Sequence, residues 1–197
     1  MLFTGKGDDG TTKTFGCDQR ISKSSATAEA LGSVDEVNSL LGLVKMKDGD
    51  TKAVAGLDYH ALLSEVQQDL FVAQAELAGA EKHVERARVE KLEGWVNAIE
   101  EELPKIRSFF VSGGTALAAS CDFARTIARR AERRVVEALR NDRGDSLALK
   151  GVSSINKNEV NDHKDLLAYM NRLSSLLYAL ARLANHRARV AEEKPHY

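Results

Sequence analysis

Nonpolar residues recur every three or four positions over five long stretches of this chain, a spacing typical of amphipathic helices. These stretches are residues 30–44, 63–77, 89–103, 117–139 and 166–184. The 197 residues include only two prolines, Pro104 and Pro195, so little interrupts a helix inside any stretch. Because most of the connections are short, we expect an all-α protein built as a five-helix up-and-down bundle.

The fourth stretch stands apart because its nonpolar residues are mostly alanine, including Ala124, Ala128 and Ala131. Small side chains let a neighbouring helix approach closely, which suits either the centre of a bundle or a subunit interface. The hydroxyls of the preceding segment 112–115 can cap the first amides of this helix. Pro104 should stop the helix before it.

The chain is expected to form one domain over residues 1–197, because its 43% nonpolar content is enough for a single core. Two segments lack a helical period and are predicted to be loops, residues 1–25 and 141–162, with the bundle covering 26–190. The second loop is long for a compact domain. Loops of that length are usually either functional or disordered.

Overall charge and cysteine content exclude several classes of protein. The 28 Lys and Arg residues balance 29 Asp and Glu residues, so nothing attracts the whole chain to nucleic acid or to an anionic membrane. Cys17 and Cys121 lie far apart, which is typical of a reducing compartment. No nonpolar run reaches the roughly 18 to 20 residues of a membrane span. We therefore expect a cytoplasmic protein without membrane or nucleic-acid partners.

The N-terminal segment 4–13 is rich in glycine and carries two lysines and three threonines. Glycines expose backbone N–H groups and permit positive φ angles, so this segment could bind a polyphosphate. Gly5 and Gly10 have the spacing of a Walker A loop, but Thr11 stands where that motif requires lysine. The alternative interpretation is a flexible, solvated N-terminus.

Five arginines gather within ten residues of the fourth stretch, around one glutamate. These residues are Arg125, Arg129, Arg130, Glu132, Arg133 and Arg134. Like charges one helical turn apart repel, so carboxylates or a bound polyanion are expected opposite them. The alternative is a solvated helix face on which the glutamate is an ordinary intrahelical partner.

Two other polar residues are candidates for the site. Asp35 could pair with an arginine of the fourth helix, and Asn171 could bond a ribose or phosphate oxygen; each could equally be a surface residue. The only Glu-x-x-His spacing runs from Glu193 to His196 across Pro195, which argues against a di-iron bundle and leaves metal ligands unassigned. No catalytic nucleophile is apparent.

Five sequence blocks together resemble the PduO-type ATP:cob(I)alamin adenosyltransferases. They are TGKGDDGTT at 4–12, GSVDEVNSLLG at 32–42, FFVSGGTALAA at 109–119, ARTIARRAERRVV at 124–136 and NRLSSLLYALAR at 171–182. The blocks follow the order of the family and extend over nearly the whole chain. This resemblance implies a ferritin-like five-helix bundle that assembles as a homotrimer, with ATP and the corrinoid bound at the subunit interfaces.

The resemblance also implies an activity. Enzymes of the family transfer the 5′-deoxyadenosyl group of ATP to the Co(I) of a corrinoid, forming adenosylcobalamin and triphosphate, with Mg²⁺ on the phosphates. A reductase that supplies the electron and a mutase that accepts the product are possible partners. The alternative is a non-catalytic helical bundle that binds nucleotide or another polyanion.

The family's site residues carry over by matching positions. The positions that match ATP-binding residues are Thr4, Gly5, Lys6, Gly7, Thr12, Lys13, Lys23, Arg129, Arg130, Glu132, Arg133 and Asn171. Asp35 and Arg125 match a salt bridge across the subunit interface near the corrinoid. Phe109 matches the aromatic residue below the corrinoid that displaces its axial ligand, although Phe109 could instead be a packing residue. With Arg129, these three form the expected catalytic set.

Three features depart from the family's pattern. Gly5 stands where the family usually has arginine or lysine, and Ser175 stands where an aspartate often follows NRLS. The connection over 141–162 is also longer than expected. These departures concern substrate affinity and loop closure more than the class of reaction.

Overall fold

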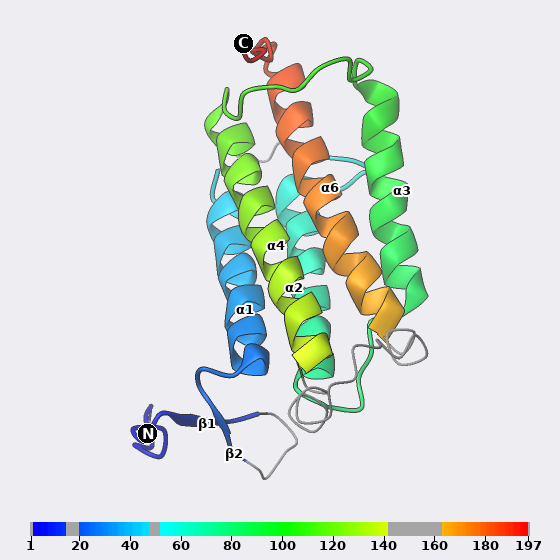
Figure 1. The fold of residues 1–197 in the computed structure, drawn as a ribbon. Coiled ribbons are helices and arrows are strands. Elements are labelled where there is room, and N and C mark those ends of the chain that lie inside the picture. Colours follow the sequence, from blue (N-terminus) through cyan, green and yellow to red (C-terminus); the bar gives the residue numbers. More distant parts are fainter. Residues whose placement is uncertain (1, 15–19, 48–51, 142–162, 197) are drawn as a thin grey trace.

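In the computed structural model, which describes residues 2–14, 20–47, 52–141 and 163–196, five helices form an up-and-down bundle (Figure 1). The helices are α1 (Ala26–Lys45), α2 (Tyr59–Leu77), α3 (Arg86–Glu102), α4 (Ala116–Asn141) and α6 (Lys164–Arg187). The predicted fold class is confirmed, and each helix coincides with one of the five periodic stretches. Of the loop predicted at 141–162, Asn141 is instead the last residue of α4, and residues 142–162 lie outside the described residues.

Helix boundaries follow from local capping. Ser25, Asp58 and Thr115 precede α1, α2 and α4, and each side chain accepts a hydrogen bond from the amide three residues ahead, at 3.2, 2.6 and 3.0 Å. Such caps satisfy backbone N–H groups that have no partner in the first helical turn. Helix α3 ends two residues before Pro104, as the sequence predicts.

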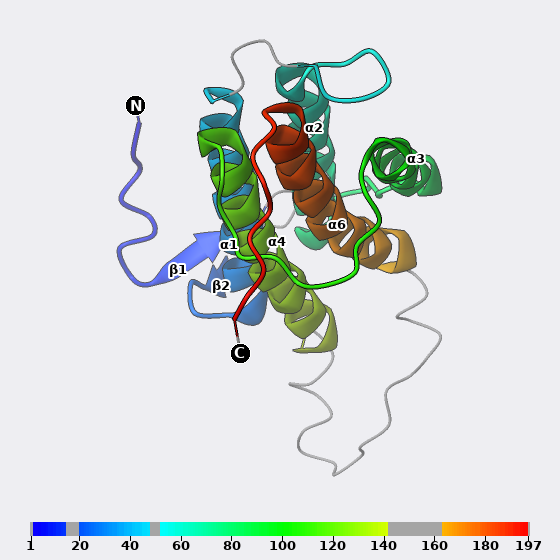
Figure 2. The same ribbon diagram turned by 90° about the horizontal axis from the view of Figure 1, so that it is seen from above.

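Helix α4 packs between α1 and α6, and Figure 2 shows it between them when the bundle is seen from above. Ala124, Ala128 and Ala131 are completely buried at these contacts. The alanines therefore serve the centre of the bundle, where small side chains let two neighbours approach one helix closely. As a result, the arginines between them face the edges of the α1 and α6 contacts.

The N-terminal segment is more regular than the sequence analysis expected. Strands β1 (Thr11–Lys13) and β2 (Arg20–Ser22) form a two-stranded antiparallel sheet, with Thr12 opposite Ile21. Each strand has only three residues, too few to show an alternating pattern, although β-branched threonine and isoleucine favour extended backbone. Figure 1 shows this sheet at the lower end of the bundle, beside the start of α1.

Within the described parts of the chain, no helix combines the length and the nonpolar character needed to cross a bilayer.

Candidate functional site

Two clefts lie one after the other along α4 and α6. The upper cleft, of about 610 Å³, is lined by residues that include Phe109, Arg125, Arg129, Ser175, Tyr178 and Arg182. Phe109 belongs to the segment between α3 and α4, which lies at the upper end of the bundle in Figure 1. The lower cleft, of about 580 Å³, is lined by Arg129, Glu132, Arg133, Val136, Glu137, Arg140 and Asn171. Arg129 lines both clefts and therefore lies at their boundary.

The arginine cluster of α4 divides into two sets. Arg130 and Arg134 face α1, where each forms an ion pair with a glutamate of that helix. Arg129 and Arg133 have no carboxylate at ion-pair distance within the described residues, and Arg133 donates instead to the carbonyl of Arg129 at 3.0 Å. The expected carboxylate partners are therefore found for the first set. The polyanion expected opposite the second set stays a prediction.

Asp35 does not pair with α4 within one chain. The neighbouring Glu36 pairs with Arg130 instead, while Asp35 is exposed on α1. Arg125 lies 3.5 Å from Asp122 in its own helix, and its buried Nε makes no hydrogen bond to the described residues. Within the described residues, Arg125 is therefore paired with Asp122 of its own helix and not with Asp35.

A hydrogen-bond network fixes the wall of the lower cleft. Asn171 is half-buried and donates to Glu132 Oε1 at 2.9 Å, which ties α6 to α4. The side-chain oxygen of Asn171, Oδ1, accepts a hydrogen bond from Arg172 at 2.6 Å, and Arg172 also donates to Glu93 of α3 at 2.9 Å. Asn171 is thus a satisfied polar residue at the cleft, and it orients the Glu132 carboxylate beside Arg129.

Phe109 projects from the segment that connects α3 to α4. It is 82% exposed and lines the upper cleft, whereas the next residue, Phe110, lies under the Arg182 guanidinium at 5.3 Å from the ring centre. The packing role considered for Phe109 therefore belongs to Phe110. A large aromatic side chain exposed at a cleft is more informative than a buried one, because exposure forgoes its hydrophobic contribution to folding.

The segment that carries Phe109 is held from two sides. Arg182 is buried, donates to both oxygens of Glu192 at 2.8 and 3.0 Å, and donates to the carbonyl of Pro104 at 3.1 Å. The amide of Val111 donates to the carbonyl of Glu193 at 2.8 Å. Figure 2 shows the C-terminal tail crossing this segment. The tail and α6 together hold Phe109 at the rim of the upper cleft.

The start of α4 is held by a close contact at Gly114. Asn185 accepts from the amide of Thr115 at 2.9 Å and donates to the carbonyl of Gly113 at 2.8 Å. Gly114 has a φ of +98°, and a β-carbon there would overlap the side-chain amide of Asn185. Glycine is therefore required at this position for both its conformation and its size.

Replacing Gly114 with alanine should destabilise the fold by about 2 to 4 kcal/mol, since it adds positive-φ strain to an overlap with a buried amide. Urea unfolding measures the loss. Gly79→Ala is the matched control, because Gly79 also has a positive φ, +82°, but has open space around its β-carbon position. Equal losses in the two variants would show that the contact with Asn185 contributes nothing.

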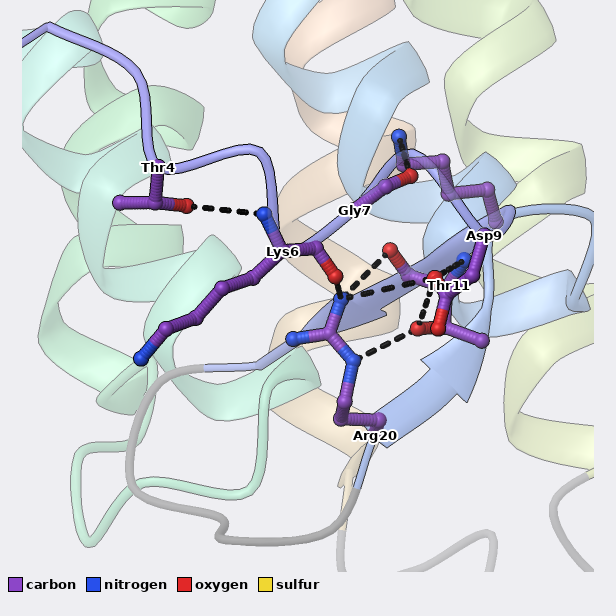
Figure 3. Close-up of polar contacts among 7 residues, drawn as sticks. Thr4, Lys6, Gly7, Asp9, Thr11 and Arg20 are labelled. Atoms are coloured by element: carbon purple, nitrogen blue, oxygen red, sulfur yellow. Dashed lines mark hydrogen bonds and ion pairs between the residues drawn. The ribbon is translucent and has the colours of Figure 1, made fainter.

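The N-terminal segment forms a compact turn above β1 (Figure 3). Gly5 and Gly10 have φ angles of +67° and +80°, as the glycine-rich pattern predicts. Lys23 Nζ donates to the carbonyl of Gly7 at 2.7 Å, and a β-carbon on Gly7 would lie 3.0 Å from the carbonyl oxygen of Thr11. This described part of the N-terminus is thus a defined turn, held by the hydrogen bond from Lys23 and by the close packing at Gly7.

The residues expected to bind ATP fall into separate groups. One group occupies the N-terminal turn and sheet, and the other lies on α4 and α6 around the lower cleft, with Arg130 on the α1 side. None of the described residues of the N-terminal segment lines either the upper or the lower cleft. Thr12 and Lys13 instead line a third cleft, of about 670 Å³, beside α1 and α2. One chain alone does not bring the predicted site together.

A family model described as cobalamin adenosyltransferase matches residues 2–184 of the chain. The chain belongs to the cobalamin adenosyltransferase family. Among the curated relatives of this family member, the corrinoid adenosyltransferase PduO of Salmonella typhimurium is 34% identical over 202 residues, which cover 98% of this chain and 53% of the relative. The corrinoid adenosyltransferase of Bacillus subtilis is 31% identical over 195 residues, covering 97% and 90%. The chain thus spans about half the length of the PduO relatives.

Solved structures of the family have the same fold. A phenylalanine-to-alanine variant of the PduO-type ATP:corrinoid adenosyltransferase of Lactobacillus reuteri, complexed with cobalamin and ATP, superposes with a TM-score of 0.80 at 27% identity, over 100% of both chains. An arginine-to-lysine variant of that enzyme, complexed with ATP, has a TM-score of 0.80 at 29% identity, over 99% of this chain and 100% of the other.

Several residues of this family member's clefts were not singled out by sequence reasoning. The ring centre of Tyr178 lies 5.9 Å from the guanidinium carbon of Arg125. Burial raises the pKa of the Tyr178 phenol, so its hydroxyl is a hydrogen-bond donor at neutral pH. Arg182 and Asn185 anchor the upper rim, and Arg20 organises the N-terminal turn. The sequence could have indicated Arg182, because a charged residue within a nonpolar helical stripe needs a polar partner if it is buried.

Proposed function

We propose that this chain transfers the 5′-deoxyadenosyl group of ATP to the Co(I) centre of a corrinoid, forming adenosylcobalamin and triphosphate. The names of its relatives and the cobalamin and ATP in a solved relative support this activity. The observation that carries the proposal is the position of Arg129, an arginine without a carboxylate partner in the described residues, where the two clefts meet. One cleft suits a large ring system, and the other suits a polyanion.

The reaction needs no nucleophile from the protein. Co(I) attacks C5′ of ATP, a Co–C bond forms, and the C5′–O bond breaks with its electron pair passing to the triphosphate oxygen; cobalt is formally oxidised from Co(I) to Co(III). Negative charge grows on the leaving oxygen in the transition state. Preorganised cations that face this oxygen lower the barrier, and holding both substrates in line lowers it further.

The clefts give each residue a proposed role. Arg129 and Arg133 neutralise the triphosphate in the lower cleft, and Asn171 holds Glu132 in place beside them. Mg²⁺ would be bound mainly by phosphate oxygens and would neutralise their charge, with Glu132 of the lower cleft as a candidate protein ligand. Phe109 occupies the lower face of the corrinoid in the upper cleft.

We further propose that the complete site forms between subunits of a homotrimer. The N-terminal strands lie at the same end of the bundle as the end of α4 (Figure 1), yet no described N-terminal residue lines the lower cleft. A second copy could therefore place its N-terminal segment, 1–25, over the lower cleft of the first. The exposed Asp35 and the half-buried Arg125 are the pair proposed to join the copies near the corrinoid.

Replacing Asp35 with asparagine should weaken both assembly and turnover, the latter by roughly tenfold, because Arg125 would lose the opposite charge across the interface. Sedimentation velocity and the anaerobic activity assay measure the two effects. Glu29→Gln is the control, since it removes another exposed carboxylate of α1, one that has a partner within the chain, Arg134, at 3.4 Å. Unchanged assembly and turnover in the Asp35 variant would remove this assignment.

The proposal includes the setting of the reaction. We place the enzyme in the cytoplasm, as a single adenosyltransferase domain, with a reductase supplying the electron that forms Co(I) and a mutase accepting the product. The near-neutral net charge of -1 is consistent with small-molecule substrates, which need only local charge.

An anaerobic assay with cob(I)alamin, ATP and Mg²⁺ tests the proposed activity. A light-sensitive product identified as adenosylcobalamin, formed together with triphosphate, is the expected result. ATP binding without any product would instead favour a non-catalytic nucleotide-binding bundle. Binding of random RNA that fades steeply as salt rises would favour the interpretation of the arginine cluster as a general polyanion site.

A further inference from the structure

Arg20, the first residue of β2, connects three points of the N-terminal turn. Its Nε donates to Thr11 Oγ1 at 2.6 Å, and its Nη2 donates to the carbonyl oxygens of Lys6 at 2.5 Å and Thr11 at 2.9 Å. Asp9 lies 3.9 Å away and accepts from the amide of Thr11 at 2.9 Å. Figure 3 shows the guanidinium group enclosed by these oxygens. The planar, rigid fork of arginine suits several acceptors at fixed angles.

The bonds of Arg20 determine what it can do. Two of its three guanidinium nitrogens are already occupied by oxygens of the turn, so most of its hydrogen-bonding capacity is directed into the loop. Its side chain is only 35% exposed. Arg20 is therefore placed to hold the backbone of the turn in shape. A direct contact with phosphate would have only the remaining N–H groups of Arg20 available.

Lys6 is the residue on which this shaping acts. Arg20 holds its carbonyl, and Thr4 Oγ1 accepts from its amide at 3.4 Å, so its backbone is held on both sides. In Figure 3 its side chain extends away from the cluster, and within the described residues its ammonium group forms no ion pair. Lys23, by contrast, is engaged with the carbonyl of Gly7. Lys6 thus presents an available cation on a fixed backbone.

Gly5 explains why the cation at position 6 matters in this chain. The resemblance described above puts arginine or lysine at position 5, whereas glycine has no side chain to offer a phosphate. Its φ of +67° turns the backbone just before Lys6. The missing charge can therefore come from the next residue, provided that the turn directs it correctly.

We propose that Arg20 is a positioning residue that holds Lys6 towards the triphosphate of ATP, so that Lys6 supplies the cation that Gly5 lacks. The inference rests on the proposed function, because it assumes that the N-terminal turn binds ATP. Arg20 acts through the carbonyl of Lys6 and the shape of the turn, and Lys6 makes the contact with phosphate.

The test compares Arg20→Gln, Lys6→Gln and the double variant in the assembled, full-length protein. Each single variant should raise the KM and the calorimetric Kd for ATP about tenfold, with a smaller change in kcat and an unchanged KM for the corrinoid. The double variant should be no worse than Lys6→Gln alone, because the two residues act as one unit. Arg20→Lys should recover only part of the affinity, since lysine lacks the fork.

Arg86→Gln is the control, because Arg86 is an exposed arginine with two ion pairs on α3, at 3.2 and 3.3 Å, far from the turn in sequence. A normal ATP affinity in Lys6→Gln would overturn the proposal, even if Arg20→Gln failed to fold. So would fully multiplicative effects in the double variant, which would mean that Arg20 acts independently of Lys6. If the unaltered protein bound no ATP, the proposed function would fail as well.

Discussion

Replacing Arg129 with alanine is expected to reduce turnover by about 100- to 1000-fold, the scale seen when one preorganised donor to a developing anion is lost. Arg129 lines both clefts, and in the proposed mechanism its guanidinium group faces the oxygen that leaves C5′. The bundle should remain folded, because this side chain is exposed and its removal leaves no buried carboxylate unpaired. Anaerobic measurement of kcat with cob(I)alamin and ATP, together with a thermal melt, separates the two effects.

Arg134→Ala provides the control for this prediction. Arg134 belongs to the same cluster on α4, but it pairs with Glu137 at 2.7 Å and with Glu29 at 3.4 Å and lines neither cleft. Surface ion pairs of this kind contribute little, so kcat should change by less than about threefold. Near-normal turnover of the Arg129 variant would count decisively against the proposed mechanism.

Replacing Phe109 with alanine should reduce activity with cob(II)alamin much more than activity with preformed cob(I)alamin. With cob(II)alamin under reducing conditions, we expect a loss of about 10- to 100-fold, because the axial ligand would stay on the cobalt and make its reduction harder. With preformed cob(I)alamin, most of the activity should remain, since no reduction step is needed. Phe109 is 82% exposed, so its removal should cost the fold little.

Phe123→Ala controls for the loss of an exposed aromatic residue. Phe123 is 58% exposed on α4 and lines neither cleft, so the ratio of the two activities should stay as in the unaltered protein. Absorbance spectra of bound cob(II)alamin give an independent measure, because loss of the axial ligand changes them. Equal losses in both assays would refute the role assigned to Phe109.

The helical bundle could be predicted because the sequence pattern of each helix is local and repeats over several turns. Each helix shows several turns of nonpolar spacing, and hydroxyl or carboxylate caps mark the starts of α1, α2 and α4. Strands β1 and β2 could not be predicted, since three residues give no period and their pairing depends on Arg20 and Thr11, nine positions apart. Short non-repeating contacts leave little trace in a single sequence.

The site was predictable in composition but not in arrangement. The arginine cluster indicated an anion site. Which of the arginines pair with carboxylates, however, depends on where α1 packs against α4, and the sequence does not show this. Asp35 and Glu36 are adjacent, and only the structure shows that Glu36 takes the partner on α4 within one chain. The contact between Arg182 and Glu192 was likewise hidden, because the tail beyond α6 has no periodic pattern.

Arg129 stands at the boundary of the two clefts, and this position has a thermodynamic consequence. A triphosphate that neutralises its guanidinium group changes the electrostatic potential at the floor of the neighbouring cleft. If ATP and a corrinoid occupy these clefts as proposed, each must alter the other's affinity, and linkage requires the factor to be the same in both directions. A single side chain would thereby make the enzyme sensitive to the cell's supply of both substrates at once.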